Sequence, residues 1–272
     1  MNEMFRNRNS AMMRNLVLNP IGIDIPSADD SLLAQHDRYF STFLANSPTL
    51  LKAAHALRFQ VYCLERKFEN AEEHPDGLEK DTYDAHAIHG VLLHRPTRAT
   101  IGTARMIFAK PGEKDSLPIM TLLRASSLDL SNYVNLTKSI EVSRFAISKE
   151  FRRRRSDQLD APVLAHANAR EINLAFLSLL QFVLRESIEH NVLFWTAVME
   201  PKFLRLLARM GICYTPIGPL VVHHGIRQPC YCYVPDMLRN AGRVQRQCWE
   251  VLTDGGVLHE ELAAKVGYLA LA

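Results

Sequence analysis

The sequence predicts an α/β (α+β) fold, with a mixed, mostly antiparallel sheet and helices on both of its faces. Two apolar runs, 87–94 and 101–108, are joined by a short turn at 95–98, which is typical of a β-hairpin. A third run, 139–147, is rich in β-branched and aromatic residues, and the long helical pattern after it ends at Asn191. Helices that alternate with the strands of one sheet in this way cover both of its faces.

Local signals place the elements of the first half. Ser47 is a favoured N-cap residue and Pro48 suits the first helical position, so a helix is predicted from Ser47 through Tyr62. The charged segment 65–84 contains a Pro-Asp-Gly turn and is predicted to be a loop. We expect a short helix near Leu122.

The long helix follows a basic turn at 150–157, and its expected N-cap is Asp157 or Asp160. The elements expected after it are a strand at 192–198, a helix from Pro201 to Gly211, and strands at 212–222 and 230–234.

These elements divide the chain into three predicted regions. Residues 1–45 form an irregular N-terminal extension that is only partly ordered, as termini often are. Residues 46–238 form the main domain, and residues 239–272 form a peripheral, helical C-terminal extension.

Composition narrows the class of protein. The chain has 272 residues, of which 47% are hydrophobic and 22% charged, as in an ordinary soluble domain. Its formal net charge of +3 is too small to predict nucleic-acid binding. The chain has no apolar run of membrane-spanning length, and its N-terminus does not have the pattern of a secretory signal. The five cysteines include no C-x-x-C pair, so we expect reduced thiols in a cytoplasmic protein.

Four short motifs carry most of the charged side chains of interest. They are Arg58-Phe59-Gln60-Val61-Tyr62, Glu79-Lys80-Asp81-Thr82-Tyr83-Asp84, Gly102-Thr103-Ala104-Arg105 and Glu141-Val142-Ser143-Arg144. Taken singly, each is typical of solvated surface charge. Arg105 and Arg144, however, lie within apolar strands, where an arginine must find an anion. The acidic motif supplies candidate partners, so we predict one buried charged network that lines a cleft.

In their order and internal spacing, these motifs resemble the signature of the acyl-homoserine-lactone (autoinducer) synthases. The resemblance is strong over residues 58–144 and looser over 145–235. It implies the acyl-CoA N-acyltransferase (GNAT-like) fold and an N-acyltransferase activity. The autoinducer synthases carry a tryptophan shortly after the first motif, and Phe68 stands at that spacing here. With the later His224-Gly225 pair, the chain is more similar to the N-acyl amino acid synthases and the acyltransferases of PEP-CTERM/exosortase systems.

This resemblance implies transfer of a long-chain fatty acyl group from an acyl carrier protein (ACP) thioester to the amine of an amino acid or similar acceptor. Acyl-CoA is the alternative co-substrate. The alternative functions are homoserine-lactone synthesis from S-adenosylmethionine and a non-catalytic acyl- or nucleic-acid-binding module. We expect no bound cofactor, no metal and no nucleic-acid partner, and a product that stays near a membrane. His86, His89 and His94 have no recognisable zinc spacing.

The resemblance also assigns roles to residues. Glu141 is the expected general base, with Arg144 and Glu79 also catalytic. The remaining motif residues are expected to bind substrate through the charged network: Arg58, Tyr62, Asp81, Asp84 and Arg105. On a regular strand, Glu141 and Arg144 would point to opposite faces, so we predict a β-bulge at 142–145 that lets them share one site.

The basic turn before the long helix is the last candidate element. It contains Arg152, Arg153, Arg154 and Arg155. These side chains suit the pantetheine phosphate at a helix N-terminus or the acidic surface of acyl carrier protein, and the alternative is a solvated basic turn. The absence of a glycine-rich spacing favours the carrier protein over CoA.

Overall fold

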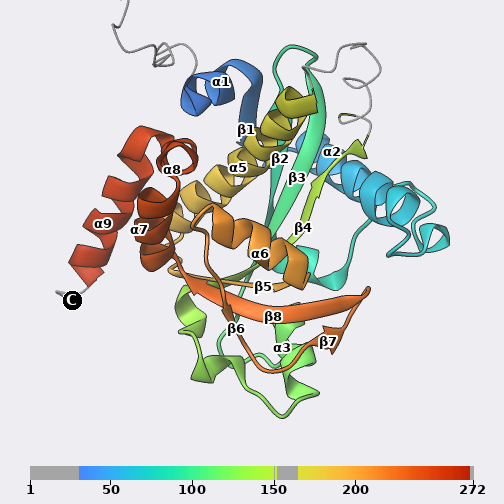
Figure 1. Ribbon diagram of the computed structural model, residues 1–272. Helices are drawn as coiled ribbons and strands as arrows, with labels where there is room; N and C mark the ends of the chain where they lie inside the picture. Colours follow the sequence, from blue (N-terminus) through green and yellow to red (C-terminus); the bar gives the residue numbers. More distant parts are fainter. Residues whose placement is uncertain (1–30, 150, 152–164, 270–272) are drawn as a thin grey trace, which may run out of the picture.

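The structure, a computed structural model, describes residues 31–149, 151 and 165–269 (Figure 1). Its eight-stranded sheet has the order β1-β2-β3-β4-β5-β8-β6, with β7 paired to β8. The strands are β1 (Phe40–Leu44), β2 (Ala87–His94), β3 (Ala99–Phe108), β4 (Ser139–Ile147), β5 (Phe194–Met199), β6 (Thr215–Pro216), β7 (Val221–Val222) and β8 (Ile226–Tyr233). Strands β4 and β5 pair in parallel, and the other described pairs are antiparallel.

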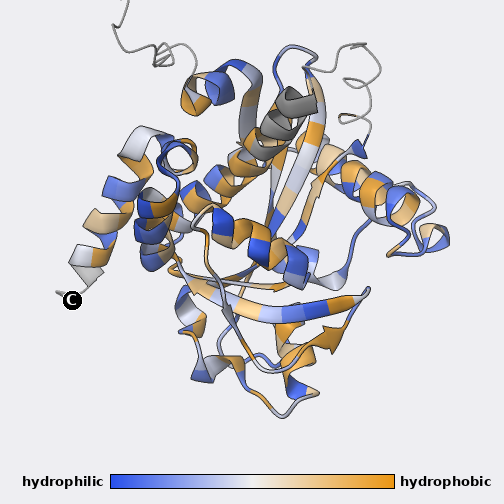
Figure 2. Cartoon of the chain, viewed as in Figure 1, coloured by the Kyte–Doolittle hydropathy of each residue, from blue (hydrophilic) through white to orange (hydrophobic). Residues whose placement is uncertain are grey.

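Helices cover both faces of this sheet, as predicted. The α-helices are α1 (Leu32–Tyr39), α2 (Pro48–Arg58), α3 (Pro118–Arg124), α5 (Ala165–Glu189), α6 (Pro201–Arg209), α7 (Val234–Val244), α8 (Arg246–Thr253) and α9 (Val257–Leu269). Shorter helical turns are η2 (Phe59–Glu65), η3 (Ala71–Glu73), η4 (Thr82–His86), η5 (Leu130–Asn132), η6 (Leu136–Lys138) and η8 (Asp254–Gly256). Hydrophilic and apolar residues alternate along α6 (Figure 2). No helix of the described residues is long and apolar enough to cross a membrane.

Adjacent residues of β2 show that α5 and α2 lie on opposite faces. A Cβ atom on Gly90 would lie 2.4 Å from the ring of Phe182, so α5 packs directly on the backbone there. The preceding residue, His89, points to the opposite face of the sheet. Its ring packs against that of His55 in α2, with the centroids 5.1 Å apart. The main apolar core lies on the α5 side and includes Trp195, which is fully buried.

The predicted bulge in β4 is confirmed. Arg105 of β3 faces Ser143, whereas Thr103 faces Ala146, so β4 contains one extra residue between these pairs. Arg144 occupies this position with a φ of 46°, in the left-handed region. The parallel pairing of β4 with β5 is confined to Ser139–Glu141, and the two strands diverge beyond it.

Two of the predicted late strands have different bounds. The expected strand at 212–222 is broken into β6 and β7, because Gly218 adopts a φ of 63° and a proline follows it. The expected strand at 230–234 begins earlier, at Ile226, and runs through Pro229. Proline is accommodated there because its carbonyl still accepts a hydrogen bond, from the N–H of Ile217 at 2.8 Å.

The two ends of the chain are more integrated than predicted. The segment expected to be irregular contains β1, which pairs with β2 at the sheet edge. The C-terminal helices are not peripheral, because Leu252 and Leu258 are buried in the main core and Gln181 of α5 donates to the carbonyl of Val251 at 2.7 Å. Apolar surface of α5 requires this cover. The boundaries of the 46–238 domain stay a prediction, and the expected cap at Asp157 or Asp160 lies outside the described residues.

Local signals in the first half were reliable. The Ser47 hydroxyl accepts from the N–H of Leu50 at 3.3 Å, as an N-cap does. The predicted helix continues as the π-helix η2 to Glu65, three residues further than expected. The predicted short helix near Leu122 is α3.

Candidate active site

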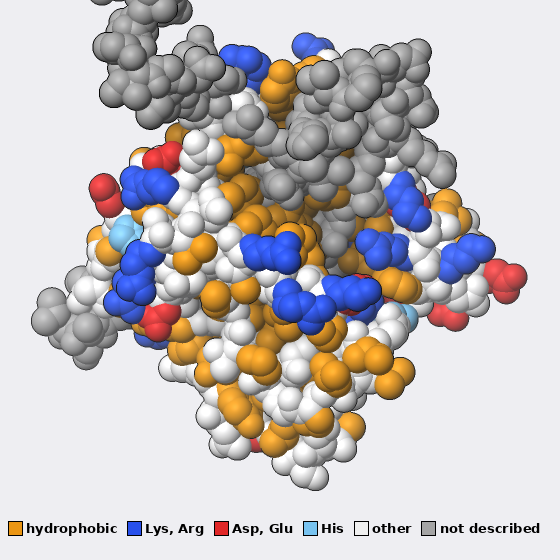
Figure 3. Space-filling model, viewed as in Figure 1, with side chains coloured by type: hydrophobic (Ala, Val, Ile, Leu, Met, Phe, Trp, Pro, Cys, Tyr) orange, Lys and Arg blue, Asp and Glu red, His pale blue; other side chains and the backbone are white. Residues whose placement is uncertain are grey.

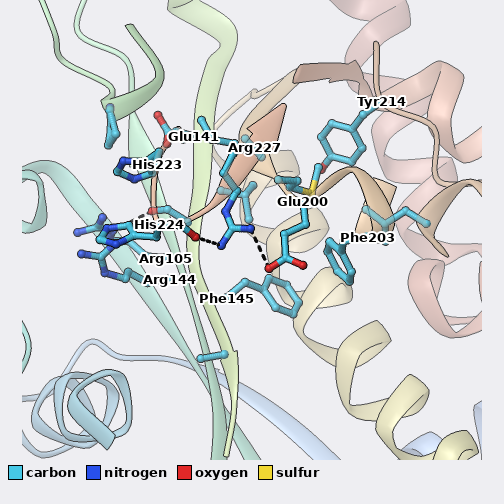
Figure 4. A pocket seen from close by; sticks show the side chains of 18 of the residues that line it. Arg105, Glu141, Arg144, Phe145, Glu200, Phe203, Tyr214, His223, His224 and Arg227 are labelled. Carbon is cyan, nitrogen blue, oxygen red and sulfur yellow. Dashed lines mark hydrogen bonds and ion pairs between the residues drawn. The ribbon is translucent and has the colours of Figure 1, made fainter. Parts of the chain in front are cut away.

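A cavity of about 460 Å³ opens where β4 and β5 diverge. One end has mainly apolar walls from β4, α5 and α6, which include Phe145, Phe176, Leu180, Phe203, Leu207 and Met210. The other end is polar and includes Arg105, Glu141, Ser143, Arg144, His223, His224 and Arg227 (Figure 4). On the surface, a hollow with hydrophobic side chains is bordered by Lys and Arg side chains (Figure 3). Such a cavity can hold a molecule with an apolar chain and a polar head.

Glu79 lies at the centre of the buried charged network. Arg58, at the end of α2, is 0% exposed and its Nε donates to Glu79 Oε2 at 2.5 Å. Arg144 donates to the same carboxylate from Nε and Nη2, at 3.1 and 2.9 Å to Oε1. Burial alone would raise the pKa of Glu79, but the hydrogen bonds from the two arginines outweigh it and hold the pKa at about 2. Glu79 is therefore an ionised anchor for both guanidinium groups.

The second part of the network binds Arg105. Its Nη1 donates to Asp81 Oδ1 at 2.6 Å and to Asp84 Oδ1 at 2.7 Å, and its Nε donates to Ser143 Oγ at 3.0 Å. Asp81 and Asp84 also form the capping box of η4, so the local helix fixes both carboxylates. Burial would raise the pKa of Asp84, but its bonds to Arg58 and Arg105 hold it well below the usual range.

Tyr62 and Glu69 hold the bulge in place. The guanidinium of Arg144 lies over the Tyr62 ring, 5.1 Å from its centroid, and the Tyr62 hydroxyl donates to the carbonyl of Phe145 at 3.3 Å. Arg144 Nη2 also donates to Glu69 Oε1 at 2.8 Å. Glu69 lies outside the four motifs and was not among the predicted site residues. The predicted residues from all four motifs thus meet at one site, while their part in catalysis stays a prediction.

Glu141 differs from the other buried carboxylates. It is 3% exposed and makes no ion pair among the described residues. Its Oε2 accepts one hydrogen bond, from the backbone N–H of Ile119 in the first turn of α3, at 2.7 Å. Burial raises its pKa to about 7 because that single bond and the more distant arginines do not offset the loss of water. Glu141 lines the cavity and can gain or lose a proton near neutral pH.

A hairpin that the sequence did not assign to the site closes over the polar end. The His224 ring, at the turn between β7 and β8, stacks on Phe68 with centroids 5.4 Å apart. The guanidinium of Arg227 lies 5.7 Å from the same ring and pairs with Glu200 at 2.8 Å. The only signal was the His-His-Gly turn itself, because contact with a loop more than 150 positions away leaves no local pattern.

One described group has the residue types of a metal site. Ligand atoms of His55, Asp84 and His89 lie within 4.8 Å of one another. Asp84 already accepts from Arg58 and Arg105 at Oδ1 and from the Asp81 N–H at Oδ2. A cation there would face two guanidinium groups, so this group does not fit a metal centre. Burial, followed by Arg58, lowers the pKa of His89 to about 4, and the imidazole is neutral at pH 7.

The arginines at 152–155 lie outside the described residues, so their contact with a donor stays a prediction. Trp195 belongs to the core and does not line the cavity, and its Nε1 donates to Ser187 Oγ at 2.8 Å.

The comparisons with known proteins agree with this architecture. Residues 57–160 match the family model of the GNAT acetyltransferase domain. The solved structure of TofI, in a ternary complex with an inhibitor and MTA, is 15% identical with a TM-score of 0.53, and the match covers 74% of this chain and 96% of TofI. BjaI, a CoA-dependent acyl-homoserine lactone synthase solved with SAM and isopentyl-CoA, is 19% identical with a TM-score of 0.51, over 79% of this chain and 88% of BjaI.

A third solved structure is FeeM, an N-acyl amino acid synthase from uncultured soil microbes. It is 17% identical over 74% of this chain and 93% of FeeM, with a TM-score of 0.45. A search of curated proteins found no match. The matched domain contains the charged network and the bulged strand, and the surrounding sheet has the fold of the solved synthases. Residues 57–160 of the chain are thus similar to the GNAT acetyltransferase domain.

Proposed function

We propose that this enzyme transfers a long-chain fatty acyl group from acyl carrier protein, or from CoA, to the amine of an amino acid or similar acceptor. The observation that carries the proposal is the position of Glu141. A carboxyl group with a pKa of about 7 lines the same cavity as an extended apolar wall. A base of that strength is well matched to proton transfer at neutral pH.

The reaction needs a neutral amine beside a thioester. An α-amine is largely protonated at pH 7, and ionised Glu141 accepts one of its protons, directly or through a water molecule. The amine nitrogen then attacks the thioester carbonyl, and a C–N bond and a tetrahedral oxyanion form. The C–S bond breaks next, the amide nitrogen loses its second proton, and the departing thiolate takes up a proton to become a thiol.

The charged network positions the groups around this centre. Arg144 has a left-handed backbone conformation at the bulge, and Glu79, Glu69 and Tyr62 hold its side chain. A bulge interrupts the ladder between β3 and β4, and a backbone N–H freed in this way can stabilise the oxyanion. A direct catalytic part for Glu79 is less favoured, because its carboxylate is occupied by two arginines.

The lining of the cavity supports the proposed donor and acceptor. Its apolar end, with Phe176, Phe203 and Met210, suits a fatty acyl chain rather than an acetyl group. Phe68 stands where the autoinducer synthases carry a tryptophan, which favours an amino acid over S-adenosylmethionine as acceptor. We expect no tightly bound cofactor, because amide formation from a thioester requires none.

The test is to express the wild type and Glu141→Gln in a bacterium and analyse lipid extracts by mass spectrometry. The wild type should add N-acyl amino acid masses that the variant lacks. Masses of N-acyl homoserine lactones would support the alternative acceptor instead. If the purified enzyme released no thiol from acyl carrier protein or CoA thioesters with any amine, the proposed function would be wrong.

A further inference from the structure

The Phe68 ring contacts basic side chains from two separate parts of the chain. The His224 ring stacks on it, and the guanidinium groups of Arg227 and Arg66 lie 5.7 and 5.8 Å from its centroid. All four of these residues line the cavity, together with His223. We call Arg66, His223, His224 and Arg227 the basic rim. Figure 4 shows its hairpin members beside Glu141 and Arg144 at one end of the cavity.

The hairpin turn fixes the direction of this rim. His224 and Gly225 have φ values of 49° and 100°, and the N–H of His223 donates to the carbonyl of Gly225 at 2.8 Å. Arg227 Nη2 donates to the carbonyl of His224 at 2.8 Å, and Nη1 pairs with Glu200 at 2.8 Å. Although it lines the cavity, the Arg227 side chain is only 12% exposed. The rim is therefore held in place before any ligand arrives.

Among the described residues, Arg66 is the rim cation without a carboxylate partner, because Arg227 pairs with Glu200 and His224 lies 3.7 Å from Glu69. Arg105 and Arg144 are matched by carboxylates of the buried network. The carboxylates that line the cavity are Glu141 and Glu200, and Glu200 is already paired with Arg227. Arg66 makes no ion pair among the described residues, so its guanidinium N–H groups can donate hydrogen bonds to a ligand. An anionic group of a substrate would find charged donors at this rim.

We propose that the basic rim binds the carboxylate of the acceptor, so that the enzyme requires an α-amino acid and rejects amines that lack a carboxylate. This inference rests on the proposed function. In an α-amino acid a single carbon separates amine and carboxylate, so an amine placed at Glu141 brings its carboxylate to the same end of the cavity. The phosphate of a donor is separated from the thioester by the whole pantetheine arm, which makes it a poorer fit to a rim that shares a cavity with Glu141.

The experiment compares free amino acids with their α-carboxamides, which keep the amine and side chain but lose the negative charge. Arg66→Gln and Arg227→Gln are each measured with both acceptors and with a fixed palmitoyl donor. The ratio of kcat/KM for the acid to kcat/KM for the amide should fall about 10- to 100-fold in Arg227→Gln, as expected for loss of a hydrogen bond between charged groups. Arg66→Gln, at an exposed residue, should lower the same ratio without affecting folding.

The control is Arg38→Gln, which removes one exposed positive charge from α1, outside the cavity lining, and should leave the ratio unchanged. Arg227→Lys keeps the charge and should restore part of the preference. A wild type that acylates acids and amides equally, or variants that raise KM only for the donor, would overturn the carboxylate site while leaving the acyltransferase intact. A wild type that acylates no amine would instead remove the proposed function.

Discussion

Two buried glutamates at the same site have opposite chemistry. Glu79 is 1% exposed and Glu141 is 3% exposed, so burial does not distinguish them. Glu79 accepts from the guanidinium groups of Arg58 and Arg144 and has a pKa of about 2, whereas Glu141 accepts from one backbone N–H and has a pKa of about 7. The number of cations within bonding distance decides which carboxylate is a fixed anion and which can move a proton.

The position of the arginines explains the division. The bulge at Arg144 turns that side chain toward Glu79, and Asp81 and Asp84 hold Arg105, so neither guanidinium forms an ion pair with Glu141. The network thus holds the side chains of the site in position, and it leaves the carboxyl group of Glu141 able to exchange a proton. Pairs of carboxyl groups whose surroundings separate their pKa values are a recurring basis for assigning catalytic roles.

The largest contrast should be in stability. Glu79→Gln leaves Arg58 and Arg144 without their shared anion and should lower the free energy of unfolding by about 3–5 kcal/mol, the usual cost of breaking a buried pair. Glu141→Gln leaves no unpaired charge and should change it by less than about 1 kcal/mol or increase it. Urea unfolding of both variants at pH 8 measures this. Equal losses would show that the two sites are not energetically distinct.

The pH dependence of stability should show the same contrast within the wild type. Ionised Glu79 stabilises the fold above its ordinary pKa of 4.5, and this stabilisation is lost as the pH falls toward about 2. Glu141 acts in the opposite direction, because its protonated form is favoured in the fold and stability decreases as the pH rises from 4.5 to about 7. Neutral His89, with a pKa of about 4, gains stability over much of the same range, so the contribution of Glu141 is the difference in urea midpoint between Glu141→Gln and the wild type. The midpoint of Glu141→Gln should rise relative to that of the wild type as the pH increases from 4.5 to about 7, and a constant difference would contradict the assignment.

A smaller effect is expected at the apolar end of the cavity, on the preference of the enzyme for one acyl chain length over another. Phe203→Trp narrows the wall between α6 and β4 and should lower kcat/KM for a palmitoyl donor about tenfold relative to an octanoyl donor, since a few methylenes no longer fit. Phe43→Trp, on an exposed position of β1, is the matched control and should leave the ratio of the two donors unchanged. An unchanged ratio in Phe203→Trp would place the acyl chain elsewhere.

The site residues that could be predicted from the sequence are those that conflict with their local surroundings. Arg105 and Arg144 conflicted with apolar strands, which led to their carboxylate partners, and the opposite faces expected for Glu141 and Arg144 led to the bulge. Each conflict has a local signature, so no distant contact had to be known in advance.

The remaining features depend on contacts between distant segments. Glu69, Arg227 and Glu200 carry no local signal, because Glu69 meets Arg144 of β4, and Arg227 meets Glu200 and Phe68, only in the folded chain. The burial of Leu252 against α5 was likewise hidden, since an amphipathic helix at the end of a chain has the same pattern whether it covers this core or another surface.

The most direct test of the account is the pH dependence of kcat in the wild type and Glu141→Gln, with saturating acyl donor and amino acid. The wild type should gain activity with rising pH through an apparent pKa near 7 and then level off. Glu141→Gln should be about 10²- to 10⁴-fold slower at the plateau, with no limb near 7. A variant that kept the wild-type turnover and the same limb near pH 7 would show that another group takes the proton.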